Sequence, residues 1–205
     1  MKDLLIDKTN SKIIVLAEEF INQSQKSIFW IHGKSGYGKT AIVDYLVDRF
    51  MEKNKKVCPL TSEDIVNLIV NAARNQYSNK WILSHFEGYD LLVFDNIDIL
   101  LNNKYFTQTS IKELLQKISE GGKIKIILTT GTNLNKLRNL RFNIDEIYRV
   151  NLKKPTIDFK TKLLKKYLER NKMNAPKGIL YNIAKGTDNL FQLNGLFHQL
   201  QFIKK

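Results

Sequence analysis

The sequence has 205 residues, of which 43% are hydrophobic and 26% are charged, and its net charge is +13 at pH 7. This length and composition suit one folded unit with a buried core, and they exclude a largely disordered chain and several independent domains. The apolar runs are strand-sized, far short of the roughly 20 residues that span a bilayer, and the first residues lack the pattern of a signal peptide. We therefore expect a cytoplasmic protein with no membrane contact.

The positive charge is the one unusual bulk property. A field of this sign attracts polyanions in a salt-dependent way, and nucleic acid is the obvious partner. The alternative is a solvated surface, because Lys and Asn are abundant along the whole chain, as AT-biased coding alone would produce. Charge by itself therefore leaves direct nucleic-acid binding open.

Strand-like and helix-like apolar patterns alternate along most of the chain, which is typical of an α/β fold. In chain order we expect a helix at 13–21, a strand at 28–31, a helix at 42–50, a strand at 57–60, a helix at 65–72, a strand at 91–94, a helix at 111–118, and strands at 124–130 and 148–152.

Pro155 marks the predicted boundary between two parts of the chain, because the strand patterns cease beyond it. Three helical segments follow, at 157–170, 176–185 and 189–203. We therefore expect an α/β core over residues 1–154 and a small helical lid over residues 155–205.

A glycine-rich loop joins the first predicted strand to the helix after it. Its sequence fits the Walker A pattern in full, as Gly33-Lys34-Ser35-Gly36-Tyr37-Gly38-Lys39-Thr40. In this pattern, backbone N–H groups surround the β- and γ-phosphates, the lysine neutralises their charge, and the threonine hydroxyl ligates Mg²⁺. We expect this loop and the following Ala41 to bind ATP or ADP with Mg²⁺.

The strand at 91–94 ends at Asp95, which suits the Walker B role of giving one carboxylate to Mg²⁺. The next residue is Asn96, where most hydrolysing relatives have a second carboxylate that polarises the attacking water. An amide orients water but cannot take its proton. Loss of a general base lowers the reaction rate by about 10²- to 10⁴-fold, so we expect slow ATP hydrolysis. The alternative is that Asp98 or a neighbouring subunit supplies the missing group.

These motifs resemble, in order and spacing, the AAA+ core of the DnaA family. The likeness extends through the lid to Leu196 and rests on segments 27–33, 61–63, 94–98 and 126–130. It implies an AAA+ P-loop NTPase with a five-stranded parallel sheet and a small C-terminal three-helix lid. The segment Asp95-Asn96-Ile97-Asp98 most resembles that of the short Hda-like regulators. These regulators lack the DNA-binding domain that follows the lid in DnaA.

The resemblance also implies catalytic positions besides Asn96. Thr130 falls at the sensor I position, although the Asp that comes next in DnaA is Gly131 here. Arg141 falls at the arginine finger, which reaches the γ-phosphate of an adjacent subunit, with Arg138 as a second possibility. The alternative for both arginines is a solvated basic turn.

The last lid helix has Phe191 where the family carries its sensor II arginine. If this face of the helix meets the nucleotide, the lid recognises the base or the shape of the nucleotide rather than the charge of its phosphates. We therefore include Phe191 in the expected nucleotide site, and we expect ATP and ADP to be distinguished poorly.

Three functions stay open. The leading hypothesis is a DnaA-related regulator of replication initiation, which binds adenine nucleotide, hydrolyses it weakly or not at all, and docks onto DnaA or another replication protein. The second is a helicase loader or transposition helper ATPase that binds single-stranded DNA through its basic surface. The third is a nucleotide-stabilised adaptor that never turns over. Because AAA+ sites usually lie between protomers, a homo-oligomer or a contact with a related ATPase is expected as well.

Overall fold

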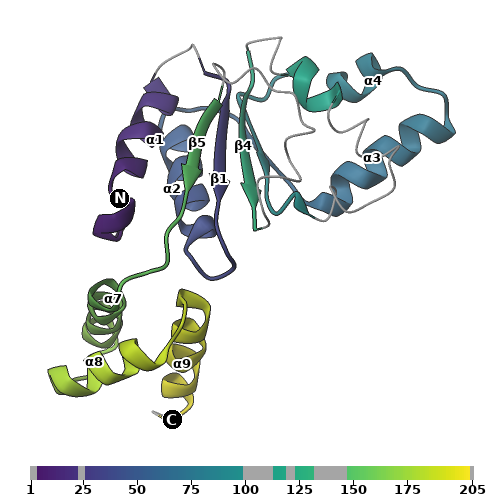
Figure 1. Ribbon diagram of the computed structural model, residues 1–205. Helices are drawn as coiled ribbons and strands as arrows, with labels where there is room; N and C mark the ends of the chain where they lie inside the picture. Colours follow the sequence, from purple (N-terminus) through teal and green to yellow (C-terminus); the bar gives the residue numbers. More distant parts are fainter. Residues whose placement is uncertain (1–3, 23–25, 99–112, 119–122, 132–146, 204–205) are drawn as a thin grey trace.

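The computed structural model describes residues 4–22, 26–98, 113–118, 123–131 and 147–203. Helices lie on both sides of one sheet, and a group of three further helices follows the last strand (Figure 1). Within the described ranges, every helix falls short of the length and apolarity that crossing a bilayer would require.

The sheet has five parallel strands, as predicted. In chain order they are β1 Ile28–His32, β2 Val57–Leu60, β3 Leu91–Phe94, β4 Lys125–Thr130 and β5 Ile147–Asn151. Their order across the sheet is β2-β3-β4-β1-β5, so β1 lies between β4 and β5. β3 and nearly all of β1 and β4 are buried, which explains why their sequences read as continuous apolar runs.

Two helical layers cover this sheet (Figure 1). The core helices are α1 Lys12–Asn22, α2 Lys39–Glu52, α3 Ser62–Arg74 and α4 Asn79–Ser84, with a short 3₁₀ helix, η1 Lys8–Asn10, before α1 and a further helical stretch at 113–118. One apolar cluster joins α1 and α2 to the sheet around Phe20 and Leu46. A second cluster joins α3, α4 and residues 113–118 to the other face around Ile65 and Leu92.

A pair of side chains caps the start of helix α3. The Thr61 hydroxyl accepts the Asp64 N–H at 3.1 Å, and the Asp64 carboxylate accepts the Thr61 N–H at 2.8 Å. This reciprocal pair is a capping box, which satisfies two N–H groups that the helix itself leaves without partners.

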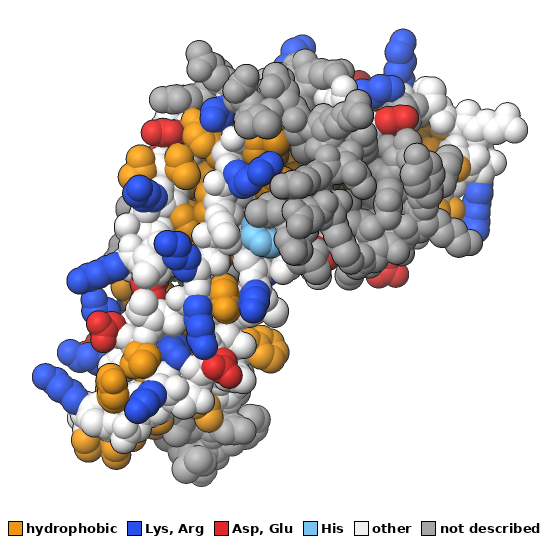
Figure 2. All heavy atoms as spheres, in the orientation of Figure 1, with side chains coloured by type: hydrophobic (Ala, Val, Ile, Leu, Met, Phe, Trp, Pro, Cys, Tyr) orange, Lys and Arg blue, Asp and Glu red, His pale blue; other side chains and the backbone are white. Residues whose placement is uncertain are grey.

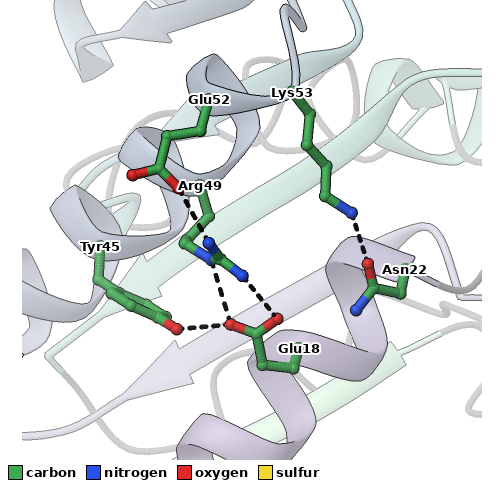
Figure 3. A network of polar contacts seen from close by, with 6 residues as sticks. All are labelled: Glu18, Asn22, Tyr45, Arg49, Glu52 and Lys53. Atoms are coloured by element: carbon green, nitrogen blue, oxygen red, sulfur yellow. Dashed lines mark hydrogen bonds and ion pairs between the residues drawn. The ribbon is translucent and has the colours of Figure 1, made fainter. Parts of the chain in front are cut away.

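A polar network at the surface fastens α1 to α2 (Figure 3). The Glu18 carboxylate accepts hydrogen bonds from the Tyr45 hydroxyl at 2.5 Å and from the Arg49 guanidinium at 3.2 and 3.3 Å. The bond from Tyr45 is the main reason that the pKa of Glu18 is lowered. The network therefore joins two helices that also share an apolar cluster on one face of the sheet.

Beyond Pro155 the chain forms the lid helices α7 Ile157–Arg170, α8 Lys177–Gly186 and α9 Leu190–Ile203. They enclose a small apolar cluster of their own, formed by Leu164, Leu168, Leu180, Ala184 and Leu193. We propose that core and lid divide at residues 154 and 155, and this separate cluster supports that division.

The N-terminal segment binds the connection between core and lid. The buried Asp7 carboxylate accepts the Thr156 N–H at 2.6 Å and the Thr9 N–H at 3.1 Å, so one side chain contacts the N-cap residue of α7 and also caps η1. The Asn10 side chain exchanges two hydrogen bonds with the main chain of Lys153, at 3.1 and 3.4 Å. Burial acts to raise the pKa of Asp7, but the hydrogen bonds from Thr156 and Thr9 outweigh it and lower the pKa.

The variant Asp7→Ala tests this junction. It leaves two N–H groups without their acceptor, so we expect the free energy of unfolding near neutral pH to fall by about 1–3 kcal/mol, measured by urea denaturation. Glu169→Ala, which removes only an exposed ion pair with Lys165, is the control and should change little.

The same pair of proteins has a predictable pH dependence. Because folding lowers the pKa of Asp7, its charged form stabilises the fold fully above the ordinary value of about 3.9 and loses that effect as the pH falls through the lowered pKa. The difference in stability between wild type and Asp7→Ala should therefore narrow below about pH 4. Equal stability of the two proteins at neutral pH would contradict the role of Asp7.

Candidate nucleotide site

The glycine-rich loop of residues 33–40 leads from the end of β1 into α2. Gly36 and Gly38 have φ angles of +74° and +97°, in the left-handed region that other residues rarely adopt. Gly38 is the N-cap of α2, and no side chain caps this end of the helix. A helix that begins in this way, after a loop of left-handed glycines, can direct its first N–H groups at an anion.

The start of the loop is wedged between the ends of two strands. The Gly33 N–H donates to the Thr130 carbonyl at 3.1 Å, at the end of β4. A β-carbon on Gly33 would lie 2.8 Å from the Leu152 β-carbon, just after β5, so only glycine fits here. The loop therefore leaves the sheet from a fixed point.

The Lys39 ammonium turns back into the loop. Its Nζ donates to the Gly33 carbonyl at 2.7 Å and to the Lys34 carbonyl at 3.4 Å. Burial lowers the pKa of Lys39, while the nearby carboxylates of Asp95 and Asp98 act in the opposite direction. The loop thus contains a partly desolvated positive charge with two carboxylates near it.

Asp95 lies just past β3 and is oriented by the neighbouring strand. The Thr129 hydroxyl donates to Asp95 Oδ1 and accepts the Asn96 N–H at 2.7 Å. Thr40 and Asp95 are both exposed, and they offer the hydroxyl and carboxylate oxygens that Mg²⁺ prefers. The donor types at these two positions therefore fit a magnesium ion.

Asn96 and Asp98 differ in their surroundings. Asn96 has a φ of +56°, a left-handed conformation that Asn tolerates better than most residues, and it is exposed. Asp98 is 8% exposed, and its carboxylate accepts the Gly131 N–H. The sequence offered Asp98 only as an alternative, because nothing local to the motif shows that the chain turns it back towards the loop.

The proposed sensor I residue is part of a buried hydrogen-bonded group. The Thr130 hydroxyl accepts the Trp30 indole N–H at 2.9 Å and lies 3.2 Å from His32 Nδ1. Burial is the main reason that the pKa of His32 is lowered. The sensor role of Thr130 stays a prediction, and Arg141 and Arg138 lie outside the residues that the structure describes.

The lid touches the loop through the start of α9. The Leu190 N–H donates to the Gly36 carbonyl at 2.8 Å, and a β-carbon on Gly36 would lie 2.8 Å from Asn189 Cγ and Oδ1. Phe191, the next residue, is 76% exposed, and its part in nucleotide binding stays a prediction. The sequence did not single out Asn189 or Leu190, although both directly precede the expected sensor II position.

An apolar pocket lies beside the end of the loop. The N-terminal segment, the loop, the connection to the lid and the lid itself all line it, through residues that include Leu4, Ile6, Tyr37, Ile42, Phe159 and Leu190. The sequence did not reveal this pocket, because its walls come from four segments far apart in the chain.

The sheet order, the loop between β1 and α2, and the carboxylate after β3 define a P-loop fold of the AAA+ type. Residues 3–153 match the family described as the bacterial DnaA ATPase domain, and the chain belongs to this family.

Known relatives match over most of this chain. The chromosomal replication initiator protein DnaA of Citrifermentans bemidjiense is 25% identical over 183 residues, which cover 84% of this chain and 38% of that protein. The DnaA of Deinococcus deserti is 26% identical over 175 residues, which cover 81% and 37%. The chain thus spans less than half the length of these curated relatives.

Solved structures confirm the predicted fold. Domain III of the Thermotoga maritima replication initiation protein DnaA matches with a TM-score of 0.79 at 21% identity, over 98% of this chain and 86% of that one. AMPPCP-bound DnaA from Aquifex aeolicus matches with a TM-score of 0.79 at 19% identity, over 99% and 63%.

The variant Gly36→Ala tests the contact between loop and lid. The new methyl group meets Asn189 in a left-handed backbone, so we expect a loss of about 1–3 kcal/mol in the free energy of unfolding, measured by urea denaturation.

Gly195→Ala is a matched control in the middle of α9, where a β-carbon meets nothing within 4 Å. Alanine there should stabilise the protein by about 0.5–1 kcal/mol. If the two variants had the same stability, the packing of Asn189 on the loop would be disproved.

Proposed function

We propose that this chain binds adenine nucleotide with its phosphates in the loop of residues 33–40. The observation that carries the proposal is the Lys39 ammonium, which lies inside a loop of left-handed glycines at the start of a helix. Thr40 and Asp95 would hold Mg²⁺, which neutralises phosphate charge when it is bound. The pocket beside Tyr37 and Leu190 offers apolar contacts next to the loop.

We further propose that the chain acts in replication initiation as a DnaA-related regulator, through contacts with DnaA or another replication protein. Membership in the DnaA ATPase family supports a place in this process. Hydrolysis would be slow, because the residue after Asp95 is an exposed asparagine. A homo-oligomer would place Arg141 of one subunit at the nucleotide of the next.

Single-stranded DNA binding is the second candidate. A replication initiator DnaA bound to AMPPCP and single-stranded DNA has the same fold, with a TM-score of 0.77 at 17% identity. The net charge of +13 also favours a polyanion. On the face shown in Figure 2, however, Lys and Arg side chains are spread over lid and core with acidic side chains among them. On this face, therefore, the basic side chains of the described residues do not gather into one separate patch.

Lys39→Ala tests the nucleotide site. Loss of the ammonium should weaken binding of Mg·ATP and Mg·ADP by about 10- to 100-fold in isothermal titration calorimetry, because charged hydrogen bonds to phosphate are lost. Lys165→Ala, on the exposed face of α7, should bind like the wild type. No heat from the wild type with either nucleotide would disprove the site.

The partner is tested by titrating the host's DnaA into the protein and following light scattering. We expect a complex whose stability depends on the nucleotide present. A gel shift on single-stranded DNA is the comparison, since its affinity should fall steeply with salt if DNA is the target. The regulator hypothesis would be abandoned if the protein failed to bind DnaA in every nucleotide state. Nanomolar, ATP-dependent binding of single-stranded DNA would then favour a helicase loader.

A further inference from the structure

Asp98 is a buried acidic residue at the loop, and the Walker motifs do not account for it. It is 8% exposed and accepts the Gly131 N–H, just past the end of β4. The negative charge of Asp98 acts to raise the pKa of both Lys39 and His32. Its carboxylate therefore lies on the loop side of the sheet edge, together with Asp95.

Gly131 makes room for this carboxylate. A β-carbon on Gly131 would lie 3.3 Å from Asp98 Oδ2, 3.9 Å from Lys39 Nζ and 3.9 Å from the Gly33 carbonyl. These three groups thus surround one position. In a Walker A loop the lysine reaches the terminal phosphates, so a carboxylate near the same position would lie close to the phosphoryl group that is transferred.

The main chain of Asn96 is held on both sides. Its N–H donates to the Thr129 hydroxyl at 2.7 Å, and its carbonyl accepts the Ser62 hydroxyl at 3.0 Å. After this left-handed residue, Ile97 enters the apolar core at 1% exposure, and the next residue returns to the loop. The second carboxylate of the site is therefore displaced by two positions along the chain.

We propose that Asp98, rather than Asn96, is the carboxylate that activates water for attack on bound ATP; this rests on the proposed nucleotide site. The water oxygen forms a bond to the γ-phosphorus, and the bond from that phosphorus to the β–γ bridging oxygen breaks, leaving its electron pair on ADP. One proton of the water passes to Asp98, and inorganic phosphate leaves. The slow hydrolysis of this protein runs through this residue.

Asp98→Asn is the test variant, because the amide oxygen still accepts the Gly131 N–H while the proton acceptor is lost. Single-turnover hydrolysis of Mg·ATP should fall by about 10²- to 10⁴-fold. Calorimetric affinity for Mg·ADP should change by less than about threefold, since the loop contacts that bind nucleotide stay in place. Addition of aluminium fluoride, which mimics the phosphoryl group in transfer, should tighten ADP binding in the wild type and not in the variant.

Two further variants separate a role in catalysis from a role in folding. Lys165→Ala, on the exposed face of α7, should leave the rate within about threefold of the wild type. Gly131→Ala presses on the Asp98 carboxylate without removing it, and it should slow hydrolysis by about tenfold with Mg·ADP affinity retained. It also provides the test if Asp98→Asn fails to fold, as judged by thermal melting.

The outcomes separate the two proposals. A wild type that binds Mg·ATP but does not hydrolyse it overturns the role of Asp98, and so does an Asp98→Asn variant with unchanged turnover. A wild type that binds no nucleotide overturns the proposed function itself.

Discussion

The site depends on one partly buried charge, the Lys39 ammonium. Taking an ammonium group out of water is unfavourable unless hydrogen bonds and opposite charges compensate. Here the Gly33 carbonyl accepts its hydrogen bond at 2.7 Å, and Asp95 and Asp98 supply negative charge nearby. Parallel strands make this possible, because the ends of β1, β3 and β4 lie at the same edge of the sheet.

The sequence predicts the fold well where local physics decides it. Continuous apolar runs located all five strands, and β2 and β3 have the predicted bounds. Helical spacing located the three lid helices and gave α7 its bounds. The six-residue helix α4 was missed, because one and a half turns contain too few residues to show a helical period.

The candidate site was only partly predictable. The glycine pattern identifies the phosphate loop, because the left-handed angles of Gly36 and Gly38 are a local requirement. Asp98 could be named only as an alternative, since its position depends on the turn at Asn96 and on the room left by Gly131. The contact of Asp7 with Thr156 joins residues 149 positions apart, which no local pattern reveals.

The bond from the Leu190 N–H to the Gly36 carbonyl uses main-chain atoms on both sides. Every residue except proline carries this donor, so substitutions at position 190 can alter the lining of the apolar pocket while the bond itself is kept. Lid and loop can therefore stay coupled while the side chains around them diverge during evolution.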